Sequence, residues 1–264
     1  MKVFLPSSLF CLLLPVAYLA GNSASPQRLD KLTGTSHFES LIGTNMLHTY
    51  NAGALNTDRQ LKPHRSLANS CPGDSSKPVK LFDGKSFNGW QGDTVTTWKI
   101  KEGSITGGSL KVTVPHNDFL CTDRRFGNFH LRLKFKLLGN SGFINSGVQF
   151  RSERLTDPDY EMTGYQADLG DGYWASLYDE SRRNKTLAVK DSALAAKLVK
   201  KNQWNDYELI CEERHIRIYL NGTQTVDYTE TDTTIPQSGL IGLQIHGGGK
   251  GEVWYKDIYI EELP

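Results

Sequence analysis

Cysteine is scarce in this sequence, with four in 264 residues. Cys11 lies in an apolar N-terminal run, and the other three, Cys71, Cys121 and Cys211, are widely spaced. An odd number of cysteines at wide spacing does not form a disulfide framework, and no spacing of Cys and His is typical of a zinc site. Because Cys121 and Cys211 stand in apolar, strand-like contexts, we expect both to be buried free thiols.

The sequence also lacks an excess of charge of either sign. Its 30 basic residues nearly balance 29 acidic ones, for a net charge of +1. Acidic and basic residues are interspersed, so we expect neither nucleic acid nor an anionic membrane as a partner.

No apolar run reaches the ~20 residues that a membrane-spanning helix needs. The N-terminus is instead typical of a secretory signal peptide, with Lys2 before an apolar stretch at 9–19 and small residues at 20–24. We expect residues 1–24 to be removed on export, leaving no integral membrane segment in a periplasmic or secreted protein. Residues 25–77 show neither helical nor strand periodicity and are predicted to be a flexible linker.

Residues 78–264 have the pattern of a single all-β domain. Short runs rich in β-branched and aromatic residues recur, separated by turn dipeptides such as Glu102-Gly103 and Asn221-Gly222. One helix is predicted at 192–200, with Asp191 or Ser192 as its N-cap. About a dozen strands in one unit favour an antiparallel two-sheet jelly-roll sandwich with one short helix. The predicted strands include 110–114, 119–123, 130–138, 146–151, 165–169 and 174–178.

Polar side chains share one face in each of three predicted strands. Successive side chains of a strand point to opposite faces, so each strand sends an apolar row into the core and a polar row outward. Amides, a guanidinium, a carboxylate and an imidazole are groups that bind sugar hydroxyls and transfer protons. If the three strands are neighbours, these rows line a cleft. The rows contain Gln149 with Arg151, Gln166 with Asp168, and Gln244 with His246.

The segment 164–183 adds aromatic and charged residues to this candidate site. Trp174 and Tyr178 stand among glycines and charges, which favours the rim of a cleft, although aromatic residues more often pack in a core. Glu180 and Arg183 are expected in the wall of the same site. The alternative for these two is a salt-bridged surface loop.

Two of these residues have the chemistry of proton transfer. Asp168 is the candidate general base, because a carboxylate near an imidazole and a guanidinium can have its pKa tuned. The alternative is an ion pair with Arg151 or Arg183. His246 precedes three glycines, whose small size lets a ligand approach the backbone. The alternative is a histidine hydrogen-bonded to a backbone carbonyl. Glu161 is a further candidate acid.

Several motifs together resemble the 3-keto-disaccharide hydrolase family over about residues 79–263. The resemblance implies a concanavalin A-like jelly roll with its site on the concave sheet. It also implies cleavage of glycosides that carry a ketone at sugar C3. The motifs are LFDGKSFNGW (81–90), GNSGFINSGVQFR (139–151), GYQAD (164–168), QWNDYELI (203–210), IRIYLNG (216–222) and GLIGLQIHG (239–247).

The implied reaction begins with loss of the C2 hydrogen, which the C3 ketone makes acidic, and continues with departure of the C1 substituent and addition of water. In this scheme Asp168 is the base and Glu180 or His246 the acid, with Arg151 or Arg183 holding the enolate. No cofactor is implied with certainty, and the acids leave room for a divalent metal ion whose ligands no spacing identifies. Sugar binding is expected from Gln149, Arg151, Gln166, Trp174, Tyr178, Arg183 and Gln244.

Two other function classes remain open from the sequence. A non-catalytic carbohydrate-binding module would use the same fold and aromatic residues without an acid–imidazole pair. A conventional glycosidase would need two facing carboxyls ~5–10 Å apart, which Asp168 with Glu161 or Glu180 would supply.

Overall fold

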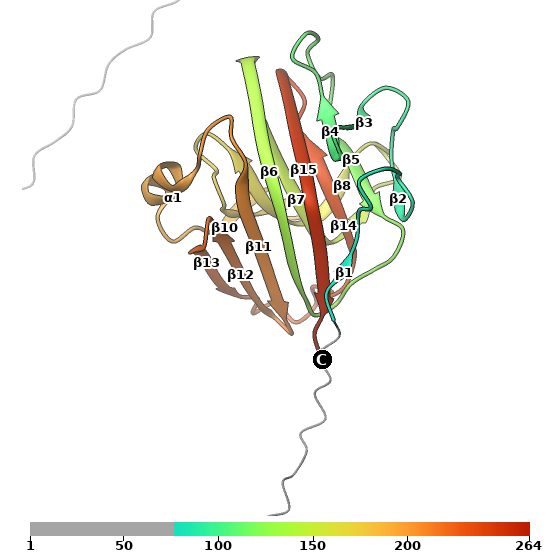
Figure 1. Ribbon diagram of the computed structural model, residues 1–264. Helices are drawn as coiled ribbons and strands as arrows, with labels where there is room; N and C mark the ends of the chain where they lie inside the picture. The colour runs from blue at the N-terminus through green and yellow to red at the C-terminus, as the bar shows by residue number, and fades with distance from the viewer. Residues whose placement is uncertain (1–76) are drawn as a thin grey trace, which may run out of the picture. The chain divides into compact units, whose positions relative to one another are not determined.

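The computed structural model describes residues 77–264. The predicted signal peptide, nearly all of the predicted linker, and Cys71 lie outside the described residues. In the described part, two antiparallel sheets and one short helix form the all-β sandwich that the sequence predicts (Figure 1). No helix between residues 77 and 264 is long and apolar enough to cross a membrane.

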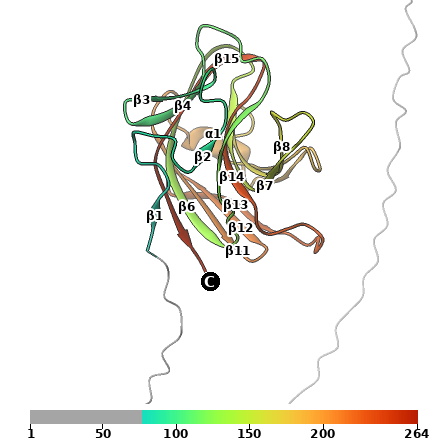
Figure 2. The ribbon, with the colours of Figure 1, turned by 90° about the vertical axis from the view of Figure 1, so that its right-hand side faces the viewer.

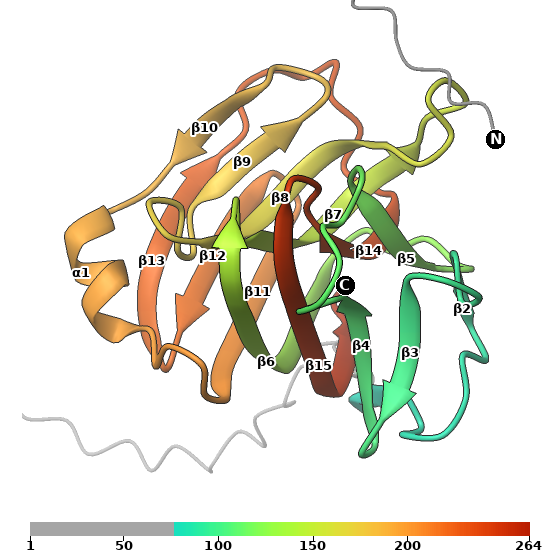
Figure 3. The ribbon, with the colours of Figure 1, turned by 90° about the horizontal axis from the view of Figure 1, so that it is seen from above.

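The first sheet has eight strands in the order β13-β12-β11-β6-β15-β4-β3, with β1 paired to β15. The long strands β6 and β15 lie side by side in its middle (Figures 1 and 3). The strands are β1 (Val79–Lys80), β3 (Trp98–Lys101), β4 (Ser104–Gly108), β6 (Phe129–Gly142), β11 (Asn205–Glu212), β12 (His215–Leu220), β13 (Thr223–Thr229) and β15 (Gly249–Glu262).

The second sheet has seven strands in the order β10-β9-β8-β7-β14-β5-β2. Its strands β7, β8 and β14 are neighbours, and these are the three strands with polar rows. The strands are β2 (Trp90–Gln91), β5 (Asp118–Thr122), β7 (Asn145–Arg154), β8 (Met162–Gly170), β9 (Leu177–Glu180), β10 (Lys185–Ala188) and β14 (Leu240–Ile245).

The main core lies between the two sheets, whose separation is visible in Figure 2. In β6 the inward side chains alternate with exposed or half-buried ones, as predicted. In β7 and β8, Phe150, Tyr165 and Leu169 belong to this core. The polar rows of these strands therefore point away from the core, onto the outer face of the second sheet. The buried residues of β6 are Leu131, Leu133, Phe135 and Leu137.

Two predicted strands differ from the structure. Residues 110–114 form no strand, because the Ser109 hydroxyl accepts hydrogen bonds from the N–H groups of Lys111 and Val112 and holds a turn. The strand predicted at 174–178 begins only at Leu177. The helix α1 (Ser192–Leu198) is present, and its N-cap is Asp191, whose carboxylate accepts from the Leu194 N–H.

The two described cysteines are buried free thiols, as expected. Burial raises the pKa of Cys121 to about 11 and that of Cys211 to about 12. Both are therefore protonated and unreactive at neutral pH.

Candidate functional site

The register of the second sheet brings the polar rows together. Gln149 of β7 pairs with Gln166 of β8, and Gly147 of β7 pairs with both Asp168 of β8 and Gln244 of β14. Gly147 leaves room for its neighbours, since a Cβ there would lie 2.6 Å from the Gln166 amide carbon. The prediction that the three strands share one polar surface is confirmed.

A pocket of about 130 Å³ opens on this surface. Three of its lining residues were not predicted. Asn145 lies on the same strand face as Gln149, one residue before the predicted start of β7, so a longer strand would have included it. Phe143 and Tyr173 are aromatic residues in loops, where strand alternation does not predict the direction of a side chain. The predicted lining residues are Gln166, Asp168, Tyr178, Glu180 and His246.

Asp168 is almost fully buried in this pocket, at 4% exposure. Its Oδ1 accepts hydrogen bonds from Asn145 Nδ2 at 2.8 Å and from the Leu169 N–H at 2.9 Å. Burial raises the pKa of Asp168 to about 7, against the lowering effect of those two bonds. Within residues 77–264 it forms no ion pair, so the pairing with Arg151 or Arg183 does not occur. Its Oδ2 is left for a ligand.

Glu180 is the second carboxyl of the pocket. Burial raises its pKa to about 7, and the negative charges of Glu161 and Asp168 add to the rise, while the Gln244 amide opposes it. The pocket therefore holds two carboxyls whose pKa values are both raised toward neutral pH. One can accept a proton while the other donates one.

His246 lines the same pocket, and its ring is also bonded to the backbone. Its Nδ1 lies 2.7 Å from the Gly247 carbonyl oxygen. Because a carbonyl only accepts, Nδ1 carries the proton and Nε2 remains available to a ligand. The Phe143 ring packs edge-on against the imidazole, with centroids 4.7 Å apart. One ring nitrogen of His246 is thus bonded to a backbone carbonyl, as the alternative expected, and the other is not.

Three glutamine amides on this face are buried with unused hydrogen-bonding atoms. Gln149 Nε2, Gln166 Oε1 and Gln244 Oε1 have no hydrogen-bond partner among the described residues, and the Gln244 amide N–H group lies near Glu180. An unsatisfied buried polar group costs about 1–3 kcal/mol. Of the three, only Gln166 lines the pocket, where a ligand rich in hydroxyls can satisfy its Oε1. Gln149 and Gln244, predicted to bind sugar, are fully buried beneath this surface.

Arg151 is not part of the pocket, contrary to the alternation pattern. A β-bulge between Phe150 and Glu153 breaks the alternation of β7, and Arg151 itself has a φ of 48°. Its guanidinium is directed away from the site and donates four hydrogen bonds there. The acceptors are the Gly127 and Glu213 carbonyls, Gln237 Oε1 and Asn128 Oδ1.

Trp174 and Arg183 are also placed elsewhere. Trp174 is buried in the main core against Phe135, with ring centroids 6.4 Å apart, and its indole N–H donates to Asp171. The rim position predicted for it is wrong, because its turn directs the ring inward. Arg183 is bound in an ion network on the core side of β9, so the salt-bridged alternative holds for this residue.

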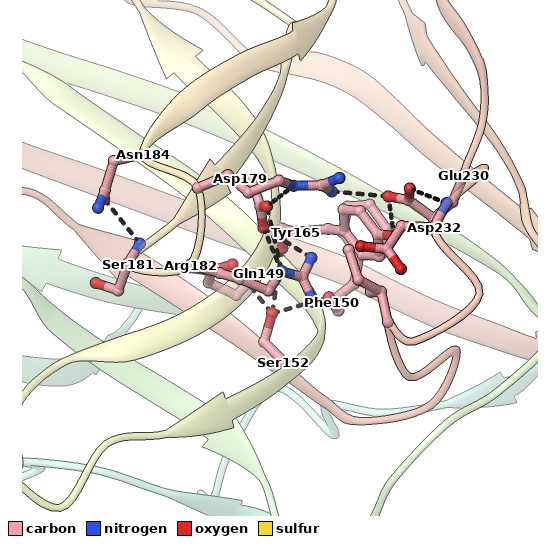
Figure 4. A network of polar contacts seen from close by, with 12 residues as sticks. Gln149, Phe150, Ser152, Tyr165, Asp179, Ser181, Arg182, Asn184, Glu230 and Asp232 are labelled. Carbon is pink, nitrogen blue, oxygen red and sulfur yellow. Dashed lines mark hydrogen bonds and ion pairs between the residues drawn. The ribbon is translucent and has the colours of Figure 1, made fainter.

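That network joins the β9–β10 hairpin to the end of β13 (Figure 4). Asp179, fully buried, pairs with Arg182 and Arg183, and Arg183 also pairs with Glu230 at 2.7 Å. The Tyr165 hydroxyl donates to Glu230 at 2.7 Å. Because Glu180 directly follows Asp179, the network fixes the strand that carries the second pocket carboxyl.

We expect Asp179→Asn to lower the free energy of unfolding by about 3–5 kcal/mol, because it leaves two partly buried guanidiniums without their shared carboxylate. The matched control is Asp206→Asn, which removes an exposed ion pair with Lys134 and should cost less than about 1 kcal/mol. Urea denaturation of both variants measures the difference. Equal small losses would show that the network adds no stability.

A metal site is not evident in this region. Between residues 77 and 264, no group of three or more His, Cys, Asp or Glu side chains is arranged to hold a metal ion. Glu161 lies at the edge of the site, where Oε2 accepts from Asn117 Nδ2 at 2.9 Å.

Comparisons with known proteins identify the family. Residues 77–261 match the family model described as a 3-keto-α-glucoside-1,2-lyase-like domain. The chain is 29% identical over 261 residues to a 3-keto-disaccharide hydrolase of Bacteroides thetaiotaomicron, covering 81% of this chain and 88% of that protein.

Solved structures share the fold. A Bacillus subtilis protein of unknown function with a galectin-like fold has a TM-score of 0.53 at 11% identity, over 72% of this chain and 98% of that one. The carbohydrate-binding module CBM66 of Bacillus subtilis has a TM-score of 0.51 at 16% identity, over 66% of this chain and 96% of that one.

Proposed function

The chain belongs to the family of 3-keto-α-glucoside-1,2-lyase-like domains, and on this premise we propose that it cleaves glycosides whose C3 hydroxyl has been oxidised to a ketone. It is an enzyme of the hydrolase or lyase type that acts on carbohydrate. One observation carries the proposal. Asp168 and Glu180 share a pocket and both have a pKa of about 7, as an acid–base pair requires.

The first step is removal of the C2 hydrogen by Asp168. The adjacent ketone acidifies this hydrogen, and the C–H electron pair moves toward the C3 oxygen to form an enolate. A carboxylate with a pKa of about 7 is a stronger base than an ordinary aspartate, yet part of the population is ionised at neutral pH. The bonds from Asn145 and Leu169 hold Oδ1, so Oδ2 is the atom that takes the proton.

The enolate needs hydrogen-bond donors near its oxygen. The arginines expected from the sequence are engaged elsewhere, so neutral groups take this role. Among the lining residues, Tyr173 and Tyr178 carry hydroxyl groups that can donate here, whereas Gln149 and Gln244 are fully buried and do not line the pocket. His246 also lines the pocket, but its Nε2 is an acceptor in the tautomer that the Gly247 carbonyl fixes, so it suits a sugar hydroxyl and not the enolate.

The second step breaks the bond from C1 to the glycosidic oxygen. Glu180, protonated in part at neutral pH, donates its proton to the departing oxygen. The products are a free alcohol and a keto-sugar with a C1–C2 double bond. Water then adds its hydroxyl to C1 and returns a proton to Glu180, while Asp168 returns its proton to C2. The sum of these steps is hydrolysis. If the unsaturated keto-sugar is released before water adds to it, the enzyme acts as a lyase.

The proposal is tested by incubating the enzyme with a disaccharide and with its 3-keto derivative. We expect cleavage of the keto substrate alone, with the unsaturated keto-sugar or the free 3-keto sugar as product, identified by mass spectrometry. Cleavage of the unoxidised disaccharide would favour a conventional two-carboxylate glycosidase. Binding of either sugar without any turnover would favour a carbohydrate-binding module.

We also propose that the enzyme acts outside the cytoplasm after removal of residues 1–24, because the N-terminus has the charge and apolar pattern of a signal peptide. Cell fractionation with N-terminal sequencing of the mature protein tests this. A cytoplasmic protein that keeps its first residues would contradict it.

A further inference from the structure

A cavity outside the catalytic pocket has no role in the chemistry described above. Its volume is about 370 Å³, and Arg154, Asp159 and Tyr160 line it together with Asp118. It is larger than the catalytic pocket, whose 130 Å³ leaves little room beyond one sugar ring. A disaccharide bound with its cleaved bond at Glu180 therefore needs further space for its second sugar.

The turn at 157–161 lines this cavity and is also connected to the catalytic pocket. On the pocket side, the charge of Glu161 is close enough to raise the pKa of Glu180. On the cavity side, Asp159 and Tyr160 are lining residues. Asn117 holds the turn in place, donating to Glu161 and accepting from the Gly247 N–H at 3.1 Å, next to His246. The wall of the cavity is therefore fixed to the backbone beside the pocket residue His246.

An aromatic platform stands on this turn. Tyr160 is stacked on His116 with ring centroids 4.0 Å apart and an interplanar angle of 20°. Tyr160 nevertheless remains 38% exposed, so one part of its ring is open to solvent. An exposed aromatic ring that is held rigidly beside a catalytic pocket is suited to stack on the apolar face of a pyranose.

Charged side chains of both signs line the cavity together with Tyr160. Arg154 Nη2 donates to the Gln91 and Phe119 carbonyls at 2.9 Å, which orients the guanidinium and leaves Nε and Nη1 without a partner among the described residues. Asp159 lines the cavity as an acceptor. The lining has more carboxyl groups than guanidiniums, since Asp93 and Asp118 also contribute. An anionic group would be repelled, whereas sugar hydroxyls can use both donor and acceptor.

We propose that this cavity is the subsite for the leaving group, and that it takes a second, uncharged sugar stacked on Tyr160 and hydrogen-bonded by Arg154 and Asp159. The inference rests on the proposed function, because it assigns the position of the group that departs from C1. It makes the enzyme selective for 3-keto-disaccharides with a neutral second sugar over those that end in a uronic acid.

The test compares wild type and Tyr160→Ala on a neutral 3-keto-disaccharide and on the methyl 3-keto-glucoside, which has no second sugar. We expect Tyr160→Ala to lower kcat/KM on the disaccharide about 5- to 10-fold, because one aromatic stacking contact is lost. On the methyl glycoside, kcat/KM should fall less than about twofold. Tyr219→Ala, on β12 of the other sheet, is the matched control. Thermal melting verifies that both variants are folded.

A second comparison uses Asp159→Asn and a 3-keto-disaccharide that ends in a uronic acid. Wild type should cleave this acid at least tenfold less efficiently than the neutral disaccharide, and the variant should narrow the gap by lowering repulsion. Two results would overturn the subsite while the proposed function stands. One is an equal loss of kcat/KM by Tyr160→Ala on the disaccharide and on the methyl glycoside. The other is an equal wild-type kcat/KM on the neutral and the acidic disaccharide. A wild type that cleaves neither the disaccharide nor the methyl glycoside would instead overturn the proposed function.

Discussion

Asp168→Asn is expected to lower kcat/KM on a 3-keto-disaccharide by about 10²–10⁴-fold, the usual contribution of a general base. The substitution keeps the size of the side chain and an oxygen that can accept from the Leu169 N–H, so the pocket should keep its shape. Only the ability to accept a proton is removed. Steady-state kinetics with melting curves separate this loss from misfolding.

The control for this variant is Asp206→Asn, a carboxylate on the other sheet that should leave activity unchanged. Retention of full turnover by Asp168→Asn would remove the residue from the mechanism. His246→Ala should also reduce kcat/KM, because the Nε2 group that faces the substrate is lost.

The same variant has a consequence for stability that depends on pH. The folded-state pKa of Asp168 is raised from 3.8 to about 7, so the folded protein binds more protons than the unfolded chain between these values. Stability contributed by the protonated group is full below pH ~4 and declines as pH rises to ~7. At 1.36 kcal/mol per unit, the decline reaches at most about 4 kcal/mol. Asp168→Asn should reduce this decline in the free energy of unfolding, which urea denaturation at pH 5 and pH 8 measures. An unchanged dependence of the unfolding free energy on pH would show that Asp168 is not buried as a neutral acid.

Glu180→Gln should have the second-largest effect on catalysis, with kcat falling about 10²-fold on a disaccharide. With two carboxyls of pKa about 7, the wild-type rate should follow a bell-shaped curve with its maximum near pH 7. The acid limb reflects protonation of the base, and the alkaline limb reflects loss of the proton from the acid. The two apparent pKa values belong to the coupled pair.

The variant should lose the alkaline limb and keep the acid limb, because only the proton donor is missing. A p-nitrophenyl 3-keto-glucoside is a sharper probe, since nitrophenolate departs without protonation and should be cleaved by the variant at close to the wild-type rate. Equal losses on the disaccharide and on the nitrophenyl substrate would exclude Glu180 as the acid.

The fold followed from the sequence because strand alternation and turn dipeptides are local signals. The regular alternation in β6 and the Asn221-Gly222 turn predicted the sandwich without tertiary information. The pocket followed in part for the same reason. Gln166 and Asp168 stand on a regular stretch of β8, and His246 directly follows the end of β14, so their faces could be assigned from the period of two.

The residues whose positions were predicted wrongly lie where the strand period of two is interrupted. Arg151 lies in a bulge, which shifts the strand face by one residue and is not visible in the pattern of polar and apolar residues. Trp174 and Arg183 belong to turns, where the direction of a side chain depends on its tertiary partners. The raised pKa values of Asp168 and Glu180 also depend on burial by chain segments distant in sequence.

The most direct measurement for the central claim is deuterium incorporation at sugar C2. The 3-keto-disaccharide is cleaved in D₂O, and the C2 position of the released 3-keto sugar, or of substrate recovered before completion, is examined by NMR. Removal of the C2 proton by Asp168 predicts deuterium at C2 with wild type, and none above the enzyme-free background with Asp168→Asn. Because Asp168 can return the same proton before it exchanges with solvent, a C2-deuterated substrate is the companion measurement. Cleavage by wild type with hydrogen fully retained at C2 and no primary isotope effect on the C2-deuterated substrate would contradict proton abstraction and leave direct displacement at C1 as the reaction.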